Sequence, residues 1–167
     1  MKSRTKTSFI RDRLRSPLTR LSNIEVFHRA KPLIPDGSVK RVVIRVWKVL
    51  RVVASERLLS IAWVSPGESR RLNRVYRRND RPTNVLSFGY GEEAGVRSSE
   101  IVLCSRIMKE EAKAIHISLE RWVVRLLIHG ILHTEGYTHD TVRSRKKMEE
   151  QERNTLELCG YDSSVIA

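Results

Sequence analysis

The segment from His129 to His139 carries the side chains best suited to chemistry. His129 and His133 are four residues apart, so on a helix both project from one face and can bind one metal ion. Gly136 can adopt the left-handed conformation that ends a helix, after which the chain can reverse and bring His139 to the same ion. Three neutral imidazoles with one open position are typical of a catalytic zinc site. The spacing predicts one divalent metal per chain, with Zn²⁺ as the first candidate and other transition metals acceptable to the same ligands.

The residue after the first histidine argues against a zinc protease. Such enzymes place a glutamate there, as the general base that activates water for attack on a peptide bond. This chain has Gly130 instead. Glu135 is a poor substitute, because six residues along a helix it points well away from His129. Either another residue acts as the base, or the reaction is of another type.

Four segments together resemble one protein family. The histidine segment HGILHTEGYTH is similar to the pattern H-G-x-L-H-x-x-G-Y-D-H of the YbeY family, bacterial metal-dependent endoribonucleases involved in ribosomal RNA maturation. Residues 72–88, LNRVYRRNDRPTNVLSF, are similar to that family's L-N-x-x-Y-R-x-x-D-x-P-T-D-V-L-S-F. Weaker similarity extends to residues 99–104 and 148–152. Over about residues 24 to 160 the chain is therefore identified as a member of this family.

The resemblance implies a single-strand-specific, metal-dependent endoribonuclease that acts in 16S rRNA 3′-end maturation and ribosome quality control. The implied partners are single-stranded RNA or an rRNA precursor, and the ribosome or its small-subunit proteins, with no small-molecule cofactor. An alternative stays open, in which the protein is an RNA- or ribosome-binding assembly factor with a mainly structural metal site. The missing glutamate keeps it open, as do three departures from the family pattern, at Asn84, Glu100 and Thr138.

Arg77 is the expected catalytic residue. It matches the arginine of L-N-x-x-Y-R, which the resemblance implies is needed for activity. A guanidinium can hold a phosphate through two parallel hydrogen bonds, and a phosphodiester under attack gathers negative charge that such a cation and a metal would stabilise. The alternative is a solvated helix surface, since six arginines lie between Arg70 and Arg81. The sequence does not choose between water and the RNA 2′-hydroxyl as the group that the metal activates.

Three further polar residues have weaker claims to a role. Asp140 follows the third histidine and could orient a ligand, act as a base, or cap a helix. His28 and His116 are isolated in the sequence and are expected on the surface or in packing.

The amino-acid composition divides the chain into a basic N-terminal arm and a single domain. The formal net charge of +13 indicates a nucleic-acid partner. Residues 1–22 carry seven lysines and arginines against Asp12, and fit either a flexible RNA-contacting tail or an organelle transit peptide. Residues 23–167 are expected to form a single metal-dependent endoribonuclease domain. Few cysteines and no membrane-length apolar run predict a cytoplasmic protein, or an organellar one if the arm is a transit peptide.

The order of the expected elements is α+β. Strands are expected at residues 23–30, 57–65, 84–88 and 100–104, and helices at residues 38–53, 66–78, 106–115 and 118–136 and from residue 142. An exposed loop is expected at residues 89–98. Ser38 and Ser65 are the expected helix caps, and Val75 and Tyr76 are expected to face inward with Leu72. The resemblance implies a small mixed, mostly parallel β-sheet with surrounding helices and a central metal-ligand helix.

Overall fold

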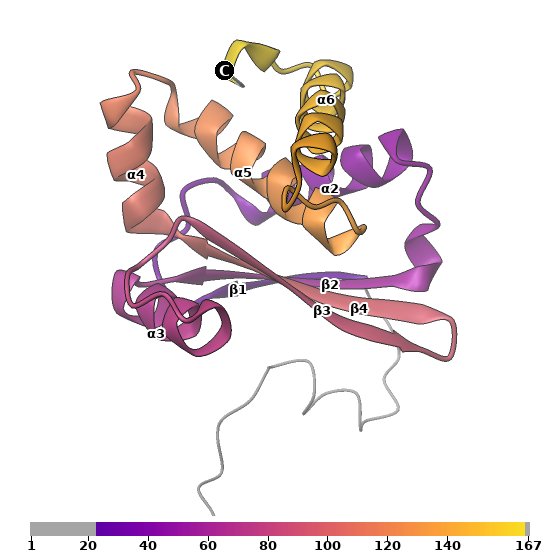
Figure 1. Cartoon of the computed structure of the whole chain (residues 1–167), viewed down its shortest axis with the longest axis horizontal. Helices are drawn as coiled ribbons and strands as arrows, with labels where there is room; N and C mark the ends of the chain where they lie inside the picture. Colours follow the sequence, from indigo (N-terminus) through magenta and orange to yellow (C-terminus); the bar gives the residue numbers. More distant parts are fainter. Residues whose placement is uncertain (1–22, 166–167) are drawn as a thin grey trace, which may run out of the picture.

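A four-stranded mixed sheet lies between two unequal layers of helices (Figure 1). The computed structural model describes residues 23–165, so the predicted basic arm at residues 1–22 lies outside the described part. The elements in chain order are β1 (Ile24–His28), α2 (Asp36–Val49), the short 3₁₀ helix η1 (Ala54–Glu56), β2 (Arg57–Val64), α3 (Pro66–Arg77), β3 (Val85–Glu93), β4 (Val96–Cys104), α4 (Ser105–Ala114), α5 (Leu119–Thr134), α6 (Val142–Leu158) and the 3₁₀ helix η2 (Ser163–Val165).

The strand order is β1-β2-β4-β3. β1 runs parallel to β2 and β2 runs parallel to β4, whereas β3 is antiparallel to β4. Parallel neighbours need a crossover connection, and α2 and α3 provide the helices of these crossovers. The predicted α+β fold with a small, mostly parallel sheet is confirmed.

The two faces of the sheet pack against different helices, because successive strand residues point to opposite faces. Leu59, Ile61 and Trp63 of β2 join the larger core, which also holds residues of α2, α4, α5 and α6. Ala62 and Val64 join a smaller core against α3. Figure 1 accordingly has α3 below the sheet and the other α-helices above it.

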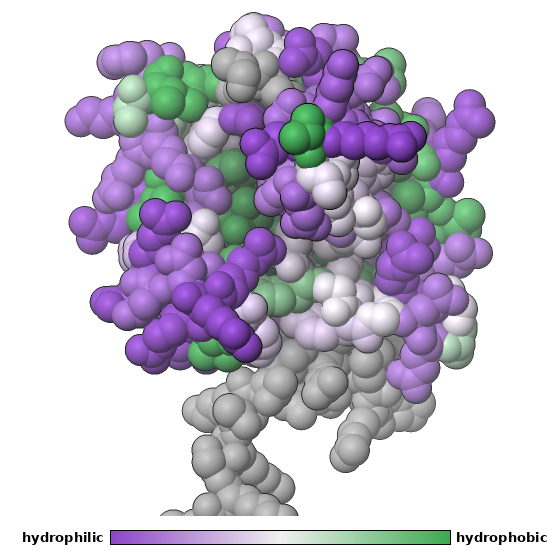
Figure 2. All heavy atoms as spheres, viewed as in Figure 1, coloured by the Kyte–Doolittle hydropathy of each residue, from purple (hydrophilic) through white to green (hydrophobic). Residues whose placement is uncertain are grey.

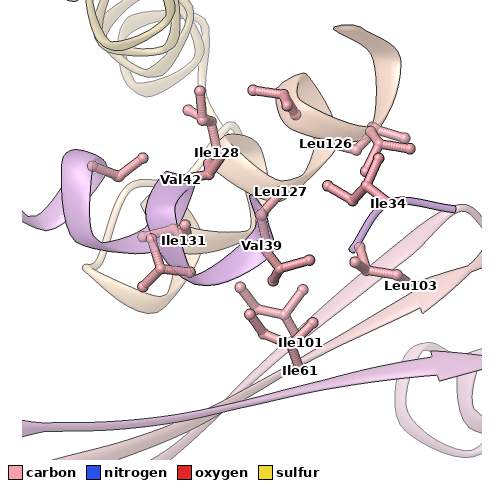
Figure 3. Packing of buried hydrophobic residues seen from close by; sticks show 14 of the residues in the cluster. Ile34, Val39, Val42, Ile61, Ile101, Leu103, Leu126, Leu127, Ile128 and Ile131 are labelled. Carbon is pink, nitrogen blue, oxygen red and sulfur yellow. The ribbon is translucent and has the colours of Figure 1, made fainter. Parts of the chain in front are cut away.

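α5 runs through the larger core and is held there on most of its sides. Its buried residues are Trp122, Val123, Val124, Leu126, Leu127, Ile128, Gly130, Ile131 and Leu132. Figure 3 shows Leu127 beside Val39 of α2, with Ile101 and Ile61 of the sheet beneath. Close packing of this kind fixes the helix that carries two of the predicted ligands. The expected central position of the metal-ligand helix is confirmed.

The segment expected to be an exposed loop at residues 89–98 is instead a β-hairpin. β3 continues to Glu93 and β4 already begins at Val96. The two turn residues, Ala94 and Gly95, have φ angles of 50° and 75°, as a two-residue hairpin turn requires. The loop prediction was wrong. Glycine and polar residues weaken the sequence signal for a strand, but they are tolerated here because backbone hydrogen bonds to β4 hold the strand.

The inward face of α3 also differs from the prediction. Val75 is 58% exposed and Tyr76 is 52% exposed, while Leu72 is partly buried against the smaller core. The buried positions of this helix are polar: Ser69 and Asn73. The prediction for Val75 and Tyr76 was therefore wrong.

The two expected helix caps have different outcomes. The Ser65 hydroxyl accepts the backbone N–H of Glu68 at 3.3 Å and caps α3, as predicted. Ser38 does not cap α2, which begins two residues earlier at Asp36. Its hydroxyl instead accepts a hydrogen bond from the Arg41 guanidinium at 2.8 Å.

Cys104 is a free thiol in the smaller core, and Cys159 is a free thiol in the larger core. Burial raises the pKa of each thiol, which disfavours the reactive thiolate. Among the helices of residues 23–165, none combines the length and the apolar character needed to cross a membrane.

Candidate metal centre

The three predicted ligands converge. His129 and His133 lie on consecutive turns of α5, and His139 lies on the loop that leads to α6. One ligand nitrogen from each ring lies within 4.8 Å of the other two, and the Nε2 atoms of His129 and His133 are 3.1 Å apart. Within residues 23–165, these three form the only such group of histidine, cysteine and carboxylate side chains that could hold a metal ion. Three nitrogen donors suit zinc and leave a fourth position for water or substrate.

Hydrogen bonds on the far side of two rings select the nitrogen that can bind metal. Nδ1 of His133 lies 2.9 Å from the carbonyl oxygen of Tyr137 and must donate to it, because a carbonyl only accepts. Nδ1 of His129 lies 3.3 Å from a carboxylate oxygen of Glu152, whose other oxygen accepts from Arg125 at 3.1 Å. Both rings thus keep Nε2 as the free donor atom, and a carboxylate behind a ligating imidazole increases its basicity.

The environment of His133 keeps its ring neutral. Burial, then the neighbouring His129 and His139, lower the pKa of His133 to about 4, against the opposing effect of the Tyr137 carbonyl. A neutral ring at neutral pH is the form that binds a metal. The charge of Arg77 also lowers this pKa, so the end of α3 reaches the histidines electrostatically.

Gly130 allows α5 to pack closely on the sheet. A Cβ atom at position 130 would lie 3.1 Å from Cγ2 of Ile101 and 3.2 Å from Oγ of Ser87. The Ser87 hydroxyl also donates to the Gly130 carbonyl at 3.1 Å. Position 130 therefore faces the sheet, and a glutamate there would force the helix away. In the described part of the chain, no carboxylate joins the three histidines themselves.

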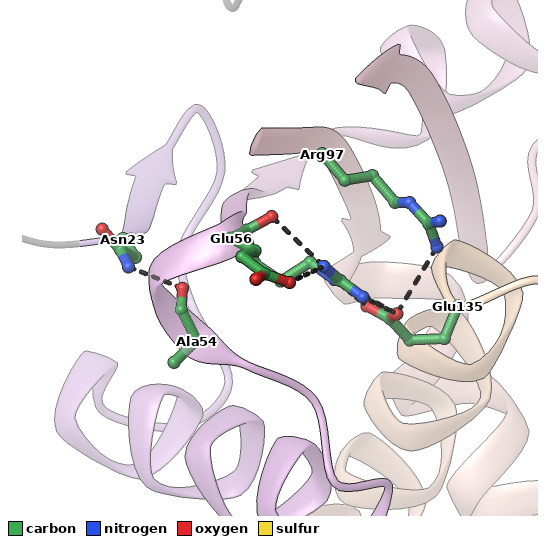
Figure 4. A network of polar contacts seen from close by, with 6 residues as sticks. Asn23, Ala54, Glu56, Arg97 and Glu135 are labelled. Atoms are coloured by element: carbon green, nitrogen blue, oxygen red, sulfur yellow. Dashed lines mark hydrogen bonds and ion pairs between the residues drawn. The ribbon is translucent and has the colours of Figure 1, made fainter. Parts of the chain in front are cut away.

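The loop that carries His139 is held at its start. Gly136 has a φ of 93°, the left-handed conformation predicted for it. Glu135 points away from the histidines, as predicted, and accepts from Arg57 at 3.0 Å with Arg97 at 3.7 Å. Figure 4 shows Arg97 and Glu135 reaching toward each other from the sheet and from the end of α5. The carboxylate is 8% exposed, so this ion-pair cluster ties the loop to β2 and β4.

Arg77 is the last residue of α3, and its side chain is exposed. Its guanidinium has no hydrogen-bond or ion-pair partner among residues 23–165. By contrast, Arg70 is paired with Asp80 at 2.8 Å. An unpaired guanidinium whose charge acts on His133 is available for an anionic ligand.

Buried polar side chains fix the end of α3. The Asn73 amide donates to the Arg81 carbonyl at 2.8 Å, and its backbone carbonyl accepts from the N–H groups of Arg78 and Asn79. Ser69 exchanges hydrogen bonds with the backbone of Thr83 at 2.7 and 3.0 Å. These contacts hold the loop that follows Arg77.

The departures from the family pattern leave all three histidines in place. The Asn84 amide donates to both oxygens of Glu111, at 3.1 and 3.0 Å, a contact that an aspartate could not make. Glu100 is buried on a strand, where burial raises its pKa and Tyr90 donates to it at 2.7 Å. Thr138 is exposed beside His139.

The weaker polar candidates lie outside the three-histidine group. Asp140 is not the helix cap, since Thr141 caps α6 by accepting the N–H of Ser144 at 3.1 Å. His28 and His116 are exposed, as expected, and His28 contacts a carboxylate at the start of α2.

Sequence reasoning missed Glu152 and Asn73 as supports of the site. Glu152 lies in the segment at residues 148–152 that resembles the family, and an acid in the last helix was the available signal. Asn73 belongs to the L-N-x-x-Y-R motif, but a polar residue on a helix gives no sign of being buried.

Comparisons with known proteins identify the family of this chain. The family described as Endoribonuclease YbeY matches residues 32–160. An Endoribonuclease YbeY of Cupriavidus metallidurans is 38% identical over 128 residues, which cover 76% of this chain and 64% of that protein. One from Cupriavidus necator is 38% identical over 119 residues, 71% of this chain and 60% of the relative. The match thus spans a little under two thirds of the length of these relatives.

Two further comparisons extend the likeness. An Endoribonuclease YbeY of Buchnera aphidicola is 33% identical over 121 residues, 71% of this chain and 79% of the relative. The solution structure of a Thermotoga maritima protein has a TM-score of 0.56 and 26% identity, covering 81% of this chain and 88% of that one. With more than half of its length matched and its ligand-bearing motif in register, the chain belongs to the YbeY family.

Proposed function

We propose that this protein is a metal-dependent endoribonuclease that cleaves single-stranded RNA in the maturation of small-subunit ribosomal RNA. The observation that carries the proposal is the convergence of three histidines within electrostatic reach of Arg77, two of which, His129 and His133, keep Nε2 free for a metal. Family membership supports it, since the curated relatives are named as endoribonucleases. The finer parts of the proposal are zinc as the metal, an rRNA precursor as substrate, the ribosome as partner and the cytoplasm as location.

His129, His133 and His139 would hold the metal. When bound, a divalent metal at such a site supplies Lewis acidity, which activates a nucleophile and stabilises negative charge on a phosphate. The protein's own residues position the reaction. Glu152 and the Tyr137 carbonyl orient two of the imidazoles, and the Glu135 cluster steadies the loop that carries the third.

Arg77 would bind the non-bridging oxygens of the scissile phosphate. Its exposed guanidinium is uncommitted, and Asn73 fixes the turn that follows it. Further exposed cations stand at the start of α6, three residues after His139: Arg143, Arg145, Lys146 and Lys147. Figure 2 shows hydrophilic side chains gathered over α3 at the lower left and around α6 near the top. Cations from both elements favour a polyanion beside the histidines.

Cleavage assays on purified protein of defined metal content distinguish three possible functions: a nuclease, a protease and an RNA-binding assembly factor. We expect cleavage of single-stranded RNA and none of casein, with about one equivalent of zinc per chain by elemental analysis. A variant with all three histidines replaced by alanine is the control for contaminating ribonuclease. Tight RNA binding without any metal-dependent cleavage would favour an assembly factor with a structural metal site.

The role of Arg77 is tested by comparison with Arg74, which lies one turn earlier on α3 and is also exposed. We expect Arg77→Ala to reduce turnover by ~100-fold or more, because a donor that stabilises developing charge is lost. RNA affinity should change little, since other cations remain. Arg77→Lys should recover little activity, because an ammonium cannot form paired contacts. Arg74→Ala should resemble wild type, and equal loss of binding in both alanine variants would reduce Arg77 to part of a basic surface.

A further inference from the structure

Tyr76 leaves an aromatic ring open next to Arg77. More than half of the residue, 52%, is exposed, which places Tyr76 among the exposed large hydrophobic side chains of the described residues. Its ring contact is with Phe88 of β3, at 5.0 Å between centroids and 63° between planes. An edge contact of this type steadies the ring but does not cover it. Phe88 is itself partly buried against the smaller core, so the open ring rests on a fixed support.

The ring lies at the same sheet edge as the metal centre. β3 is an edge strand, and its successive residues Ser87 and Phe88 point to opposite faces. Ser87 contacts Gly130, next to the first ligand His129, while Phe88 contacts Tyr76. The histidines and Tyr76 therefore lie on the two sides of one edge. Arg77 follows Tyr76 directly in the sequence and is the last residue of α3.

The charges around Tyr76 suit a nucleic acid strand. Arg70 is paired with Asp80, and Arg71 lies 3.9 Å from Glu68. Three arginines that follow Tyr76 are exposed and have no ion-pair partner within residues 23–165: Arg77, Arg78 and Arg81. An open aromatic ring among uncommitted cations is the combination that binds unpaired bases and their phosphates.

We propose that Tyr76 stacks against an unpaired base next to the scissile phosphate and thereby makes the site selective for single strands. The inference rests on the proposed RNA substrate. A strand that passes over the edge of β3 places its phosphate between Arg77 and the histidines and its neighbouring base on Tyr76. A base within a duplex is already stacked and paired, so it cannot take this position.

The test measures RNA affinity rather than cleavage, on full-length metal-loaded protein. The probes are single-stranded oligonucleotides in which one abasic nucleotide is moved through the sequence, checked by gel to remain intact during each titration. Tyr76→Ala should weaken binding of the unmodified strand by about tenfold. When the abasic nucleotide stands where the stacked base would be, the affinity of wild type should fall by the same factor of about ten. The affinity of Tyr76→Ala should not fall any further with that strand, because the stacking contact is already absent. Affinity for a matched RNA duplex should not change.

Two variants separate stacking from support of the fold. Tyr76→Phe keeps the ring and should bind like wild type, whereas Tyr76→Leu keeps an apolar contact with Phe88 but should bind like the alanine variant. Val75→Ala, equally exposed on the same helix, is the matched control. If Tyr76→Ala weakens every abasic strand and the duplex as much as the unmodified strand, stacking is overturned. Failure of the proposed nuclease function would be visible separately, as intact base-dependent binding without metal-dependent cleavage.

Discussion

The contacts of the His133 ring explain its lowered pKa. Its ring is half-buried, donates from Nδ1 to a backbone carbonyl, and faces two other imidazoles. All these contacts except the carbonyl disfavour a second proton, and the ring has a pKa of about 4. A site built in this way loses little metal affinity to protons at neutral pH.

We expect the metal-free protein to lose stability as the pH falls from about 6.5 to about 4. In that window the unfolded chain binds a proton at position 133 and the folded chain does not, so acid favours unfolding. One such group contributes a slope of up to roughly 1.4 kcal/mol per pH unit. Urea unfolding of wild type and of His133→Gln across this range measures it. If the two curves run parallel, the ring at position 133 is protonated in the folded protein as well.

The convergence of the three histidines could be predicted from the sequence because their relation is local. His129 and His133 share a helix face, and Gly136 has the conformation that the turn needs. Glu152 could not be predicted as a partner of His129, since 23 residues separate them and only the packing of α6 on α5 brings them together.

At the scale of elements, α3 and the β3–β4 hairpin show where sequence patterns fail. Helical spacing predicted an apolar inward face for α3, but the loop after it needs hydrogen-bond partners, and Ser69 and Asn73 supply them from buried positions. Tyr76 turns outward instead. The hairpin extends through glycine and acidic residues because the ladder with β4, not local propensity, decides its length. The apolar runs of β2 and α5 were predicted well, since burial on most sides leaves a continuous hydrophobic signal.

The contact between α5 and the sheet gives a prediction at this scale. Gly130→Ala should destabilise the fold by about 1 kcal/mol, because overpacking costs roughly 1–3 kcal/mol and the better helix propensity of alanine offsets up to about 1. It should also weaken metal binding, since α5 carries two ligands. Thermal unfolding and zinc titration measure the two effects.

Gly37→Ala is the matched control for this substitution. It lies in the first turn of α2, and an added Cβ would be 3.5 Å from the flexible end of Arg41, an ordinary contact. It should leave stability equal or higher, with metal affinity unchanged. Equal stability of both variants would mean that α5 can move away from the sheet without cost.

At the scale of the whole molecule, charge is the dominant property. Residues 1–22 hold seven of the 32 lysines and arginines and only one acid, so they contribute +6 of the net +13. The rest of the surplus includes exposed cations on α3 and at the start of α6, on either side of the histidines in the chain. Such a distribution favours a long anionic strand over a small anionic ligand.

We expect RNA binding to depend steeply on salt, through counterion release, and the basic arm to carry part of that dependence. Removing residues 1–22 should lower the slope of log K against log salt by up to roughly 4, from six net charges at about 0.7 each on a single strand. Thermal unfolding of the shortened protein tells whether the fold survives the removal. A double variant, Arg145→Ala with Lys146→Ala, is the comparison and should lower the slope by roughly 1.4. If removal of residues 1–22 leaves the slope unchanged while the double variant lowers it, the arm takes no part in RNA binding. That result would favour a transit peptide over an RNA-contacting tail.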